Sequence, residues 1–264
     1  MNNNSSTDYS PAWDLSDLYA GIDDPQIFND LDYALKKSIE FNSRYSGKIR
    51  KLDALEGAKS LSEYEALSEL LSKVLSFAQL VFAGNSEDSQ IAVFYQNVNE
   101  KVNSITTETI FFELELNKLS DKEIDEFKVN SEILRLEPWL DNIRREKPHQ
   151  LTAEIERILH EKIVTGRDAW SRLFDETMAN MKFKLDGAEL TNSEIMSRMA
   201  DPDNQVRKKA AKAFSGELEF HARTLSLITN TLAKDKEVED GWRNFKRPVS
   251  RRNLLNQVED EVVD

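Results

Sequence analysis

The stretch from Leu67 to Phe82, LSELLSKVLSFAQLVF, decides the fold. Its apolar side chains recur every three or four residues, which places them along one side of an α-helix. From Leu75 onward they cover more than one side, which is typical of a central helix. We therefore expect a long, central helix that ends near Gly84. The capping-box pattern S-x-x-E at residues 60–63 predicts where it begins.

One helix is expected on each side of this central one. The first has Asp24 as N-cap and Pro25 at the first helical position, and it ends at Gly47 as a left-handed C-cap. Its apolar face is predicted to contain Phe28, Leu31, Leu35 and Ile39. The other flanking helix is predicted to be the longest, as one uninterrupted run through Ile91, Phe94, Val98, Val102, Ile105, Phe112, Leu116 and Leu119. The three helices predict an up-down-up bundle with short connections.

Shorter helices and one hairpin are expected after the bundle. Alternating residues around Asp186-Gly187 predict two short strands near residues 181–191. Capping boxes at 120–123 and 191–194, and Thr152, predict three helix starts. Asp201-Pro202 predicts the start of another long helix, whose apolar positions include Phe214, Leu218, Leu225 and Ile228. The predicted fold class is all-α, a helical bundle with one small β-hairpin.

Composition agrees with a helical class and excludes several chemistries. The chain has 264 residues, a net charge of −13, no Cys, 3 His, 8 Gly and 6 Pro. So few turn residues argue against a many-stranded β protein. The absence of Cys excludes disulfides, a thiolate nucleophile and Cys-ligated zinc. The acidic balance argues against a general nucleic-acid binder, which needs a positive field.

Two further patterns bear on location. Apolar runs stay well short of the roughly 18 residues of a transmembrane helix, so no membrane partner is expected. The N-terminal residues lack the basic and apolar regions of a signal peptide. We therefore expect a cytoplasmic location.

Motifs assign no catalytic, cofactor-binding or metal-binding residue. His160-Glu161 matches the start of the zinc motif H-E-x-x-H, but Val164 occupies the second ligand position and cannot bind zinc. The other histidines are His149 and His221. Residues two apart do not share a helix face, so paired carboxylates are assigned to solvated faces. These pairs are Glu113/Glu115, Glu154/Glu156, Glu217/Glu219 and Asp235/Glu237.

A basic cluster lies near the end of the sequence. It contains Arg243, Lys246, Arg247, Arg251 and Arg252, interleaved with Trp242 and Phe245. Aromatic and basic residues together can stack on single-stranded nucleic acid. Because this is one local patch in an acidic chain, we expect contact with a partner domain or an acidic peptide instead.

Segments in order along the chain resemble one family, oligoendopeptidase F and its relatives, the thimet-oligopeptidase-like zinc peptidases. Trp13–Tyr19 is similar to the family's W-x-L-x-x-L-Y start, and Gly166–Asp175 to its G-x-x-A-W-x-x-L-[YF] segment. Asp201–Ala211 resembles D-x-D-x-x-V-R-x-x-A. Asn230–Asp235 and Phe245–Asn256 resemble the segment that leads into the catalytic domain.

The resemblance implies an almost wholly helical fold whose N-terminal part forms one wall of a channel for peptides. It also implies zinc bound by H-E-x-x-H and a downstream Glu in the C-terminal half, which this sequence lacks. We therefore expect the N-terminal, channel-forming portion of a zinc metalloendopeptidase that hydrolyses oligopeptides. Such a fragment would be inactive alone, with the C-terminal catalytic half as its partner. The alternative is a non-catalytic, acidic, helical protein-interaction module.

Four regions follow from this interpretation. They are a disordered tail at 1–12, an N-terminal helical bundle at 13–119, an oligopeptidase F N-terminal-like helical region at 120–185 and the truncated start of a catalytic helical domain at 186–264. In the last region the apolar face of the long helix would lack its partner. An exposed apolar patch of this kind favours self-association and poor solubility.

Overall fold

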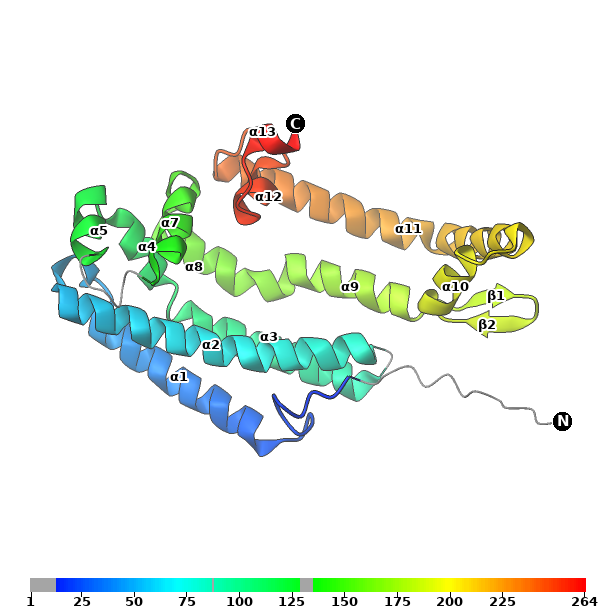
Figure 1. Cartoon of the computed structure of the whole chain (residues 1–264), viewed down its shortest axis with the longest axis horizontal. Coiled ribbons are helices and arrows are strands. Elements are labelled where there is room, and N and C mark those ends of the chain that lie inside the picture. Colours follow the sequence, from blue (N-terminus) through cyan, green and yellow to red (C-terminus); the bar gives the residue numbers. More distant parts are fainter. Residues whose placement is uncertain (1–12, 87, 129–134) are drawn as a thin grey trace.

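The computed structural model describes residues 13–86, 88–128 and 135–264, so the tail predicted at 1–12 lies outside the described residues. The fold is all-α with one antiparallel hairpin, which confirms the predicted class. Three layers are visible in Figure 1: the bundle of α1 (Pro25–Tyr45), α2 (Ala54–Gly84) and α3 (Ser89–Thr107), then α8 (Ala153–Lys162) with α9 (Arg167–Ala179), then α11 (Asn204–Trp242). Helix α8 packs on α3, and α9 packs on α11.

Short elements connect these layers. The turn η1 (Ile49–Lys51) connects α1 to α2, and between α3 and α8 lie α4 (Phe111–Lys118), α5 (Asp121–Lys128), α7 (Glu137–Glu146) and η2 (Lys147–His149). After α8 come η3 (Ile163–Thr165), β1 (Phe183–Leu185), β2 (Ala188–Leu190), α10 (Asn192–Met199), α12 (Ser250–Leu255) and α13 (Asp260–Val263). Helices α12 and α13 fold back beside the end of α11, over the same end of the molecule as α7 (Figure 1).

The central helix α2 begins earlier than the sequence predicts. Asp53 is its N-cap and accepts a hydrogen bond from the Glu56 N–H at 2.8 Å. Ser60 lies inside the helix, and its hydroxyl donates to the Gly57 carbonyl at 2.8 Å. The prediction of a start at residues 60–63 is therefore wrong. Asp53 and Glu56 form a second capping signal, D-x-x-E, earlier in the sequence, and the helix begins there. The end at Gly84 is confirmed.

The buried face of α1 also differs from the prediction. Of the four residues predicted on one apolar face, Leu31 is buried, while Phe28, Leu35 and Ile39 are exposed. The buried set is Ile27, Leu31, Ala34, Ser38, Phe41 and Tyr45. Ser38 fits this face because its hydroxyl donates to the Leu35 carbonyl at 2.8 Å, which removes the cost of burying it. The helix start at Asp24-Pro25 and the left-handed Gly47, with φ +74°, are confirmed.

The third predicted helix is two helices, α3 and α4, with a turn between them. Threonines cause the break, because their hydroxyls bond to nearby carbonyls and compete with the helical ladder. Thr107 donates to the Asn103 carbonyl at 2.8 Å, and Thr109 donates to the Thr106 carbonyl at 3.1 Å. The longest helix is α11, with 39 residues, and not the third helix.

The main core lies inside the bundle. Its largest fully buried side chains include Tyr45, Phe77, Phe112, Ile27 and Leu61. By length and composition alone α2 could cross a membrane, a test that a central bundle helix also passes. In this structure the buried side of α2 packs against α1 and α3. The up-down-up bundle predicted from the sequence is confirmed (Figure 1).

A second, smaller core lies under the hairpin. Its buried residues are Met181, Phe183, Ile195 and Ala210. The hairpin turns at Asp186 and Gly187, which both have positive φ, as a two-residue turn of this kind requires. Thr191 and Glu194 form the predicted capping box of α10. Helix α11 begins two residues later than Asp201-Pro202 predicts, with Asp203 as its N-cap.

Candidate functional site

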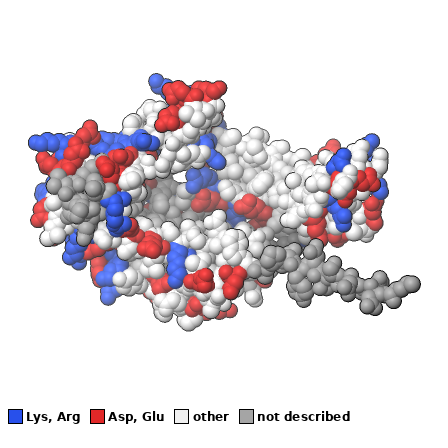
Figure 2. All heavy atoms as spheres, viewed as in Figure 1, with Lys and Arg blue, Asp and Glu red and all other residues white. Residues whose placement is uncertain are grey.

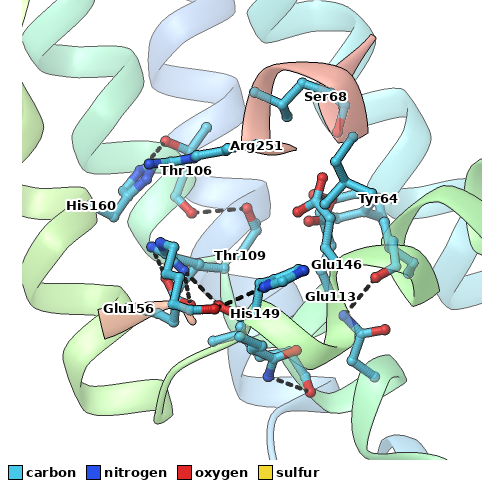
Figure 3. A pocket seen from close by; sticks show the side chains of 18 of the residues that line it. Tyr64, Ser68, Thr106, Thr109, Glu113, Glu146, His149, Glu156, His160 and Arg251 are labelled. Atoms are coloured by element: carbon cyan, nitrogen blue, oxygen red, sulfur yellow. Dashed lines mark hydrogen bonds and ion pairs between the residues drawn. The ribbon is translucent and has the colours of Figure 1, made fainter. Parts of the chain in front are cut away.

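A cavity of about 430 Å³ lies where the bundle meets the C-terminal segment. Helices α2, α4 and α7 line one side, and α3, α8, the segment after α11 and α12 line the other. In Figure 3, Tyr64, Glu113 and Glu146 are grouped on one side, away from Thr106 and His160. Polar and apolar side chains share the walls, a composition typical of a ligand site.

Arg243 holds the two sides of the cavity together. Its guanidinium donates to Glu156 on α8 at 2.7 and 2.9 Å, and to Glu239 on its own helix at 2.8 Å. The Arg243 side chain is 13% exposed, so water screens these pairs weakly. Burial, the largest single cause, acts to raise the pKa of Glu156, but the hydrogen bonds from Arg243 and from the Leu151 N–H, together with the Arg243 charge, lower it. The hydrogen bonds that Arg243 donates to Glu156 lead the causes that raise the pKa of Arg243.

Arg251 belongs to the same ion-pair network. Its guanidinium lies 2.9 Å from a Glu239 carboxylate oxygen and 4.0 Å from Asp240. Arg247 pairs with Asp264 and lies 3.7 Å from Asp260. The basic cluster predicted to meet an outside partner therefore has three of its members engaged with acids of its own chain.

Two of the three histidines lie at this cavity. The His149 ring stacks on Phe245 with 3.8 Å between centroids, and its Nδ1 lies 2.8 Å from the Arg243 carbonyl oxygen. His160 Nε2 lies 2.8 Å from the Thr106 hydroxyl. Burial lowers the pKa of His160, so its neutral form is favoured. His221 lies apart on α11, with Nε2 3.2 Å from Glu217.

Glu113 and Glu146 are the carboxylates of the cavity that lack a cation. The Tyr64 hydroxyl donates a hydrogen bond to the Glu113 carboxylate at 2.8 Å. Within the described ranges, no Lys or Arg lies within 4.0 Å of either carboxylate. Burial raises the pKa of Glu113, and the nearby Glu146 charge adds to the rise. Burial also raises the pKa of Glu146, although Arg243 and Arg251 oppose it.

Two amide oxygens on the cavity lining also lack a hydrogen-bond donor. They are Asn117 Oδ1 and Gln150 Oε1, both buried. The amide nitrogens are used: Asn117 donates to the Ile143 carbonyl at 2.9 Å, and Gln150 to the Leu114 carbonyl at 3.3 Å. Two buried acceptors on lining residues are therefore unsatisfied.

Sequence reasoning missed this arrangement. Glu113 and Glu156 were expected on solvated faces, yet both line the cavity, so that expectation is wrong for these two. Glu113 sits among Phe111, Phe112 and Leu114, and this apolar neighbourhood is the local signal that could have shown its burial. Its partner Tyr64 is 49 residues away, and no spacing rule connects them.

The described residues do not fit a zinc ion. Across 13–86, 88–128 and 135–264 no group of three or more His, Asp or Glu side chains is arranged to hold a metal. The H-E pair at His160-Glu161 points to different partners: His160 contacts Thr106, and Glu161 pairs with Arg157 at 2.9 Å.

Charges of both signs are interspersed on the face shown in Figure 2. They concentrate at the bundle end and at the hairpin end, and a largely uncharged stretch lies between them. This face has no broad positive field of the kind that supports nucleic-acid binding.

Comparison with known proteins adds three findings. The family model described as Oligopeptidase F matches residues 115–183. The chain is 24% identical to an oligoendopeptidase F homolog from Borreliella burgdorferi, over 99% of this chain and 44% of that protein. It superposes on the crystal structure of oligoendopeptidase-F from Enterococcus faecium with a TM-score of 0.79 and 17% identity, covering 90% of this chain and 48% of that one.

A further structure, from Chlamydophila abortus, aligns with a TM-score of 0.56 and 15% identity over 95% of this chain and 43% of that one. The chain thus spans less than half the length of these relatives. The similarities are all to proteins named as peptidases or peptidase homologs. Within this class they confirm the resemblance to oligoendopeptidase F, and to its N-terminal part, that the ordered motifs predict.

Proposed function

We propose that this chain is the N-terminal, channel-forming portion of a zinc metalloendopeptidase that hydrolyses oligopeptides. The observation that carries the proposal is similarity to an oligoendopeptidase F homolog over 99% of the chain but only 44% of that protein. In the proposal the catalytic residues lie outside these 264 positions, and this chain alone is inactive. The proposed location is the cytoplasm, which the absence of Cys permits.

The zinc ion in this proposal is held by a C-terminal half. When bound, zinc would polarise the scissile carbonyl and lower the pKa of a water molecule. The 264-residue chain would contribute a wall that admits short peptides and excludes folded proteins by size. A wall requires rigidity, and the well-packed bundle of α1, α2 and α3 provides it.

One face of α11 supports the partnership with a C-terminal half. Phe220, Leu227, Val238 and Trp242 are all exposed. At about 100° per residue they fall within roughly 60° of one another around the helix axis, so they form one apolar stripe. The patch predicted from the sequence is a different one. Its members Phe214, Leu218 and Leu225 pack against the second core, and Ile228 is buried.

We assign the missing C-terminal half as the occupant of this stripe, because the relatives are about twice as long as the chain. The variant Phe220→Ser with Leu227→Ser is expected to reduce capture of a co-expressed C-terminal half. The matched control is Ala211→Ser with Ala222→Ser, at exposed positions on the opposite side of α11. Equal capture by both double variants would show that the half packs elsewhere.

The proposed activity is tested by reading the source DNA downstream of the codon for Asp264. We expect H-E-x-x-H and a later Glu. The encoded segment is then co-expressed with this chain, and hydrolysis of a quenched fluorescent oligopeptide is measured against each half alone. Restored hydrolysis supports the proposal. A downstream segment without the motif, or association without hydrolysis, favours the alternative of a non-catalytic interaction module.

A further inference from the structure

The cavity between the bundle and the C-terminal segment has an unusual charge balance. Its two arginines are already engaged, Arg243 with Glu156 and Glu239, and Arg251 with Glu239. Glu113 and Glu146 line the same cavity, Glu113 half-buried and Glu146 exposed, and neither has a salt bridge within the described ranges, although the charges of Arg243 and Arg251 reach Glu146. Of the polar atoms on the lining, the unused ones are mainly oxygens, the carboxylates and the Asn117 amide oxygen. A ligand that complements this lining must be a donor and must carry positive charge.

A buried carboxylate without a partner is costly, and proteins pair such groups or leave them neutral. Glu113 has one hydrogen bond, from Tyr64, which satisfies one of several lone pairs. Asn117 is only 6% exposed, and no hydrogen-bond donor contacts its Oδ1. Two features of the lining residues, the Glu113 carboxylate without a salt bridge and the Asn117 amide oxygen without a donor, thus favour a ligand that donates hydrogen bonds.

The walls indicate what accompanies that donor. Leu67, Leu71, Ile110 and Leu254 also line the cavity, so apolar surface adjoins the carboxylates. A divalent metal ion fits poorly, because Ca²⁺ takes 6–8 oxygen ligands and two carboxylates supply few of them. A primary ammonium group with an adjoining apolar chain matches both the acceptors and the walls.

We propose that this cavity binds the ammonium group of a peptide, with Glu113 and Glu146 as its charge partners and the leucine-rich wall against the neighbouring side chain. This inference rests on the proposed function only in taking a peptide as the ligand. Two sources carry the same chemistry, the α-amino terminus and a lysine side chain. Glu113 contacts the ammonium group directly, and Tyr64 is a positioning residue that orients the Glu113 carboxylate.

The test measures binding of three short peptide amides to the whole 264-residue chain by calorimetry at low salt. The peptides are Leu-Gly-Gly amide with a free amino terminus, its N-acetylated form, and N-acetyl-Lys-Gly-Gly amide. The free amine is expected to bind at least about tenfold more tightly than its acetylated form, as a charge-assisted hydrogen bond predicts. Tight binding of the lysine peptide identifies the side chain as a source, and weak binding restricts the site to the amino terminus.

Variants connect the binding to the two carboxylates. Glu113→Gln and Glu146→Gln are each expected to remove about tenfold of the preference for the free amine. Glu113→Gln keeps an acceptor for Tyr64, and Glu146 is at the exposed rim, so at least one variant retains the fold. The matched control is Glu219→Gln, at an exposed position of α11, which is expected to change nothing. Glu146→Asp, which keeps the charge, is expected to recover most of the preference.

Three outcomes overturn the inference. They are equal binding of all three peptides, no binding at about 10 mM peptide, and a preference for the free amine that survives both glutamine variants. Each leaves the proposed function to its own test, because hydrolysis by the reconstituted halves is measured separately. Conversely, amine binding without hydrolysis by the reconstituted halves would support this binding site and contradict the proposed peptidase activity.

Discussion

The two cores of the molecule differ in size and in how they are enclosed. The bundle core is continuous from α1 through α4, and it buries large aromatic residues such as Phe77 and Phe112 on all sides. The core under the hairpin consists of four buried residues, and α11 beside it buries only Ala210, Ile228 and Asp240 along its 39 residues. Both regions consist mainly of helices, so secondary structure does not explain the difference.

Helices form in both regions, but a large buried core forms in only one of them, so different features of the sequence determine the two properties. Isolated helices gain most of their stability from tertiary packing. The bundle supplies that packing internally. The layer of α9, the hairpin, α10 and α11 obtains it from a small core and from the ion pairs of Arg243. We therefore expect the bundle to be the last part to unfold.

The largest effect is expected from two matched core truncations. Phe77 in the bundle and Phe183 in the hairpin are both fully buried, and each Phe→Ala change should cost about 3–5 kcal/mol locally. Phe77→Ala should lower the stability of the whole chain. Phe183→Ala should release the hairpin layer and leave the bundle folded. Hydrogen exchange resolved by segment, together with urea unfolding, distinguishes the two results.

The control for both variants is Phe220→Ala, because Phe220 is 81% exposed. Its effect on the free energy of unfolding should stay within about 0.5 kcal/mol. If Phe183→Ala destabilised the bundle segments as strongly as Phe77→Ala does, the two cores would be one cooperative unit. The expectation that the hairpin layer unfolds separately from the bundle would then be wrong.

The next effect concerns the link between the two regions. Arg243→Ala leaves Glu156 and Glu239 without their guanidinium partner in a poorly solvated place, which should cost about 3 kcal/mol. The loss should appear as faster hydrogen exchange at the end of α11 and in α12. Arg243→Lys keeps the charge but not the two-pronged contact with Glu156, so an intermediate loss is expected. Unchanged exchange in α12 would show that the link is made by other contacts.

A smaller effect compares two capping boxes. Thr191 caps α10 beside the small core, and Ser120 caps α5 beside the bundle, each with a Glu three residues later. Thr191→Ala and Ser120→Ala should each cost about 1 kcal/mol. Thr191→Ala is expected to lower the midpoint of the hairpin layer alone, and Ser120→Ala that of the bundle region. The same midpoint shift in both variants would again argue for one cooperative unit.

Local rules predicted the parts of this structure that local interactions determine. The hairpin at Asp186-Gly187, the Thr191 capping box and the start of α1 are each set by a few neighbouring residues, and all three are confirmed. The start of α2 was mistaken because two capping signals compete within ten residues. The break before α4 was missed because hydroxyls of Thr107 and Thr109 compete with the helical ladder.

The cavity could not be predicted in the same way. Its ion pairs join residues far apart in the sequence, such as Arg243 and Glu156, 87 positions apart. In a chain with 48 acidic residues nothing local distinguishes Glu156 from a solvated carboxylate. The family resemblance was accessible because motifs persist in order along the chain, and it provided the function class that spacing alone did not.

The smallest expected effect is on the pH dependence of stability, to which Glu113 and Glu194 contribute with opposite signs. Burial raises the pKa of Glu113 above that of the unfolded chain, so the folded state holds the extra proton between about 4.5 and the raised value. Stability should fall as pH increases through that window. The capping hydrogen bonds from Thr191 lower the pKa of Glu194, so its contribution is present above about 4.5 and lost on acidification.

Glutamine variants separate the pH dependence of stability that is due to Glu113 from that due to Glu194. Glu113→Gln cannot ionise and still accepts from Tyr64, so its stability relative to the parent chain should rise with pH above about 4.5. Glu194→Gln retains a capping side chain, so its deficit should shrink as pH falls below about 4.5. Urea unfolding at a series of pH values measures both. Parallel slopes for the two variants would mean that Glu113 is as well solvated as Glu194, and the cavity would then lose its uncompensated carboxylate.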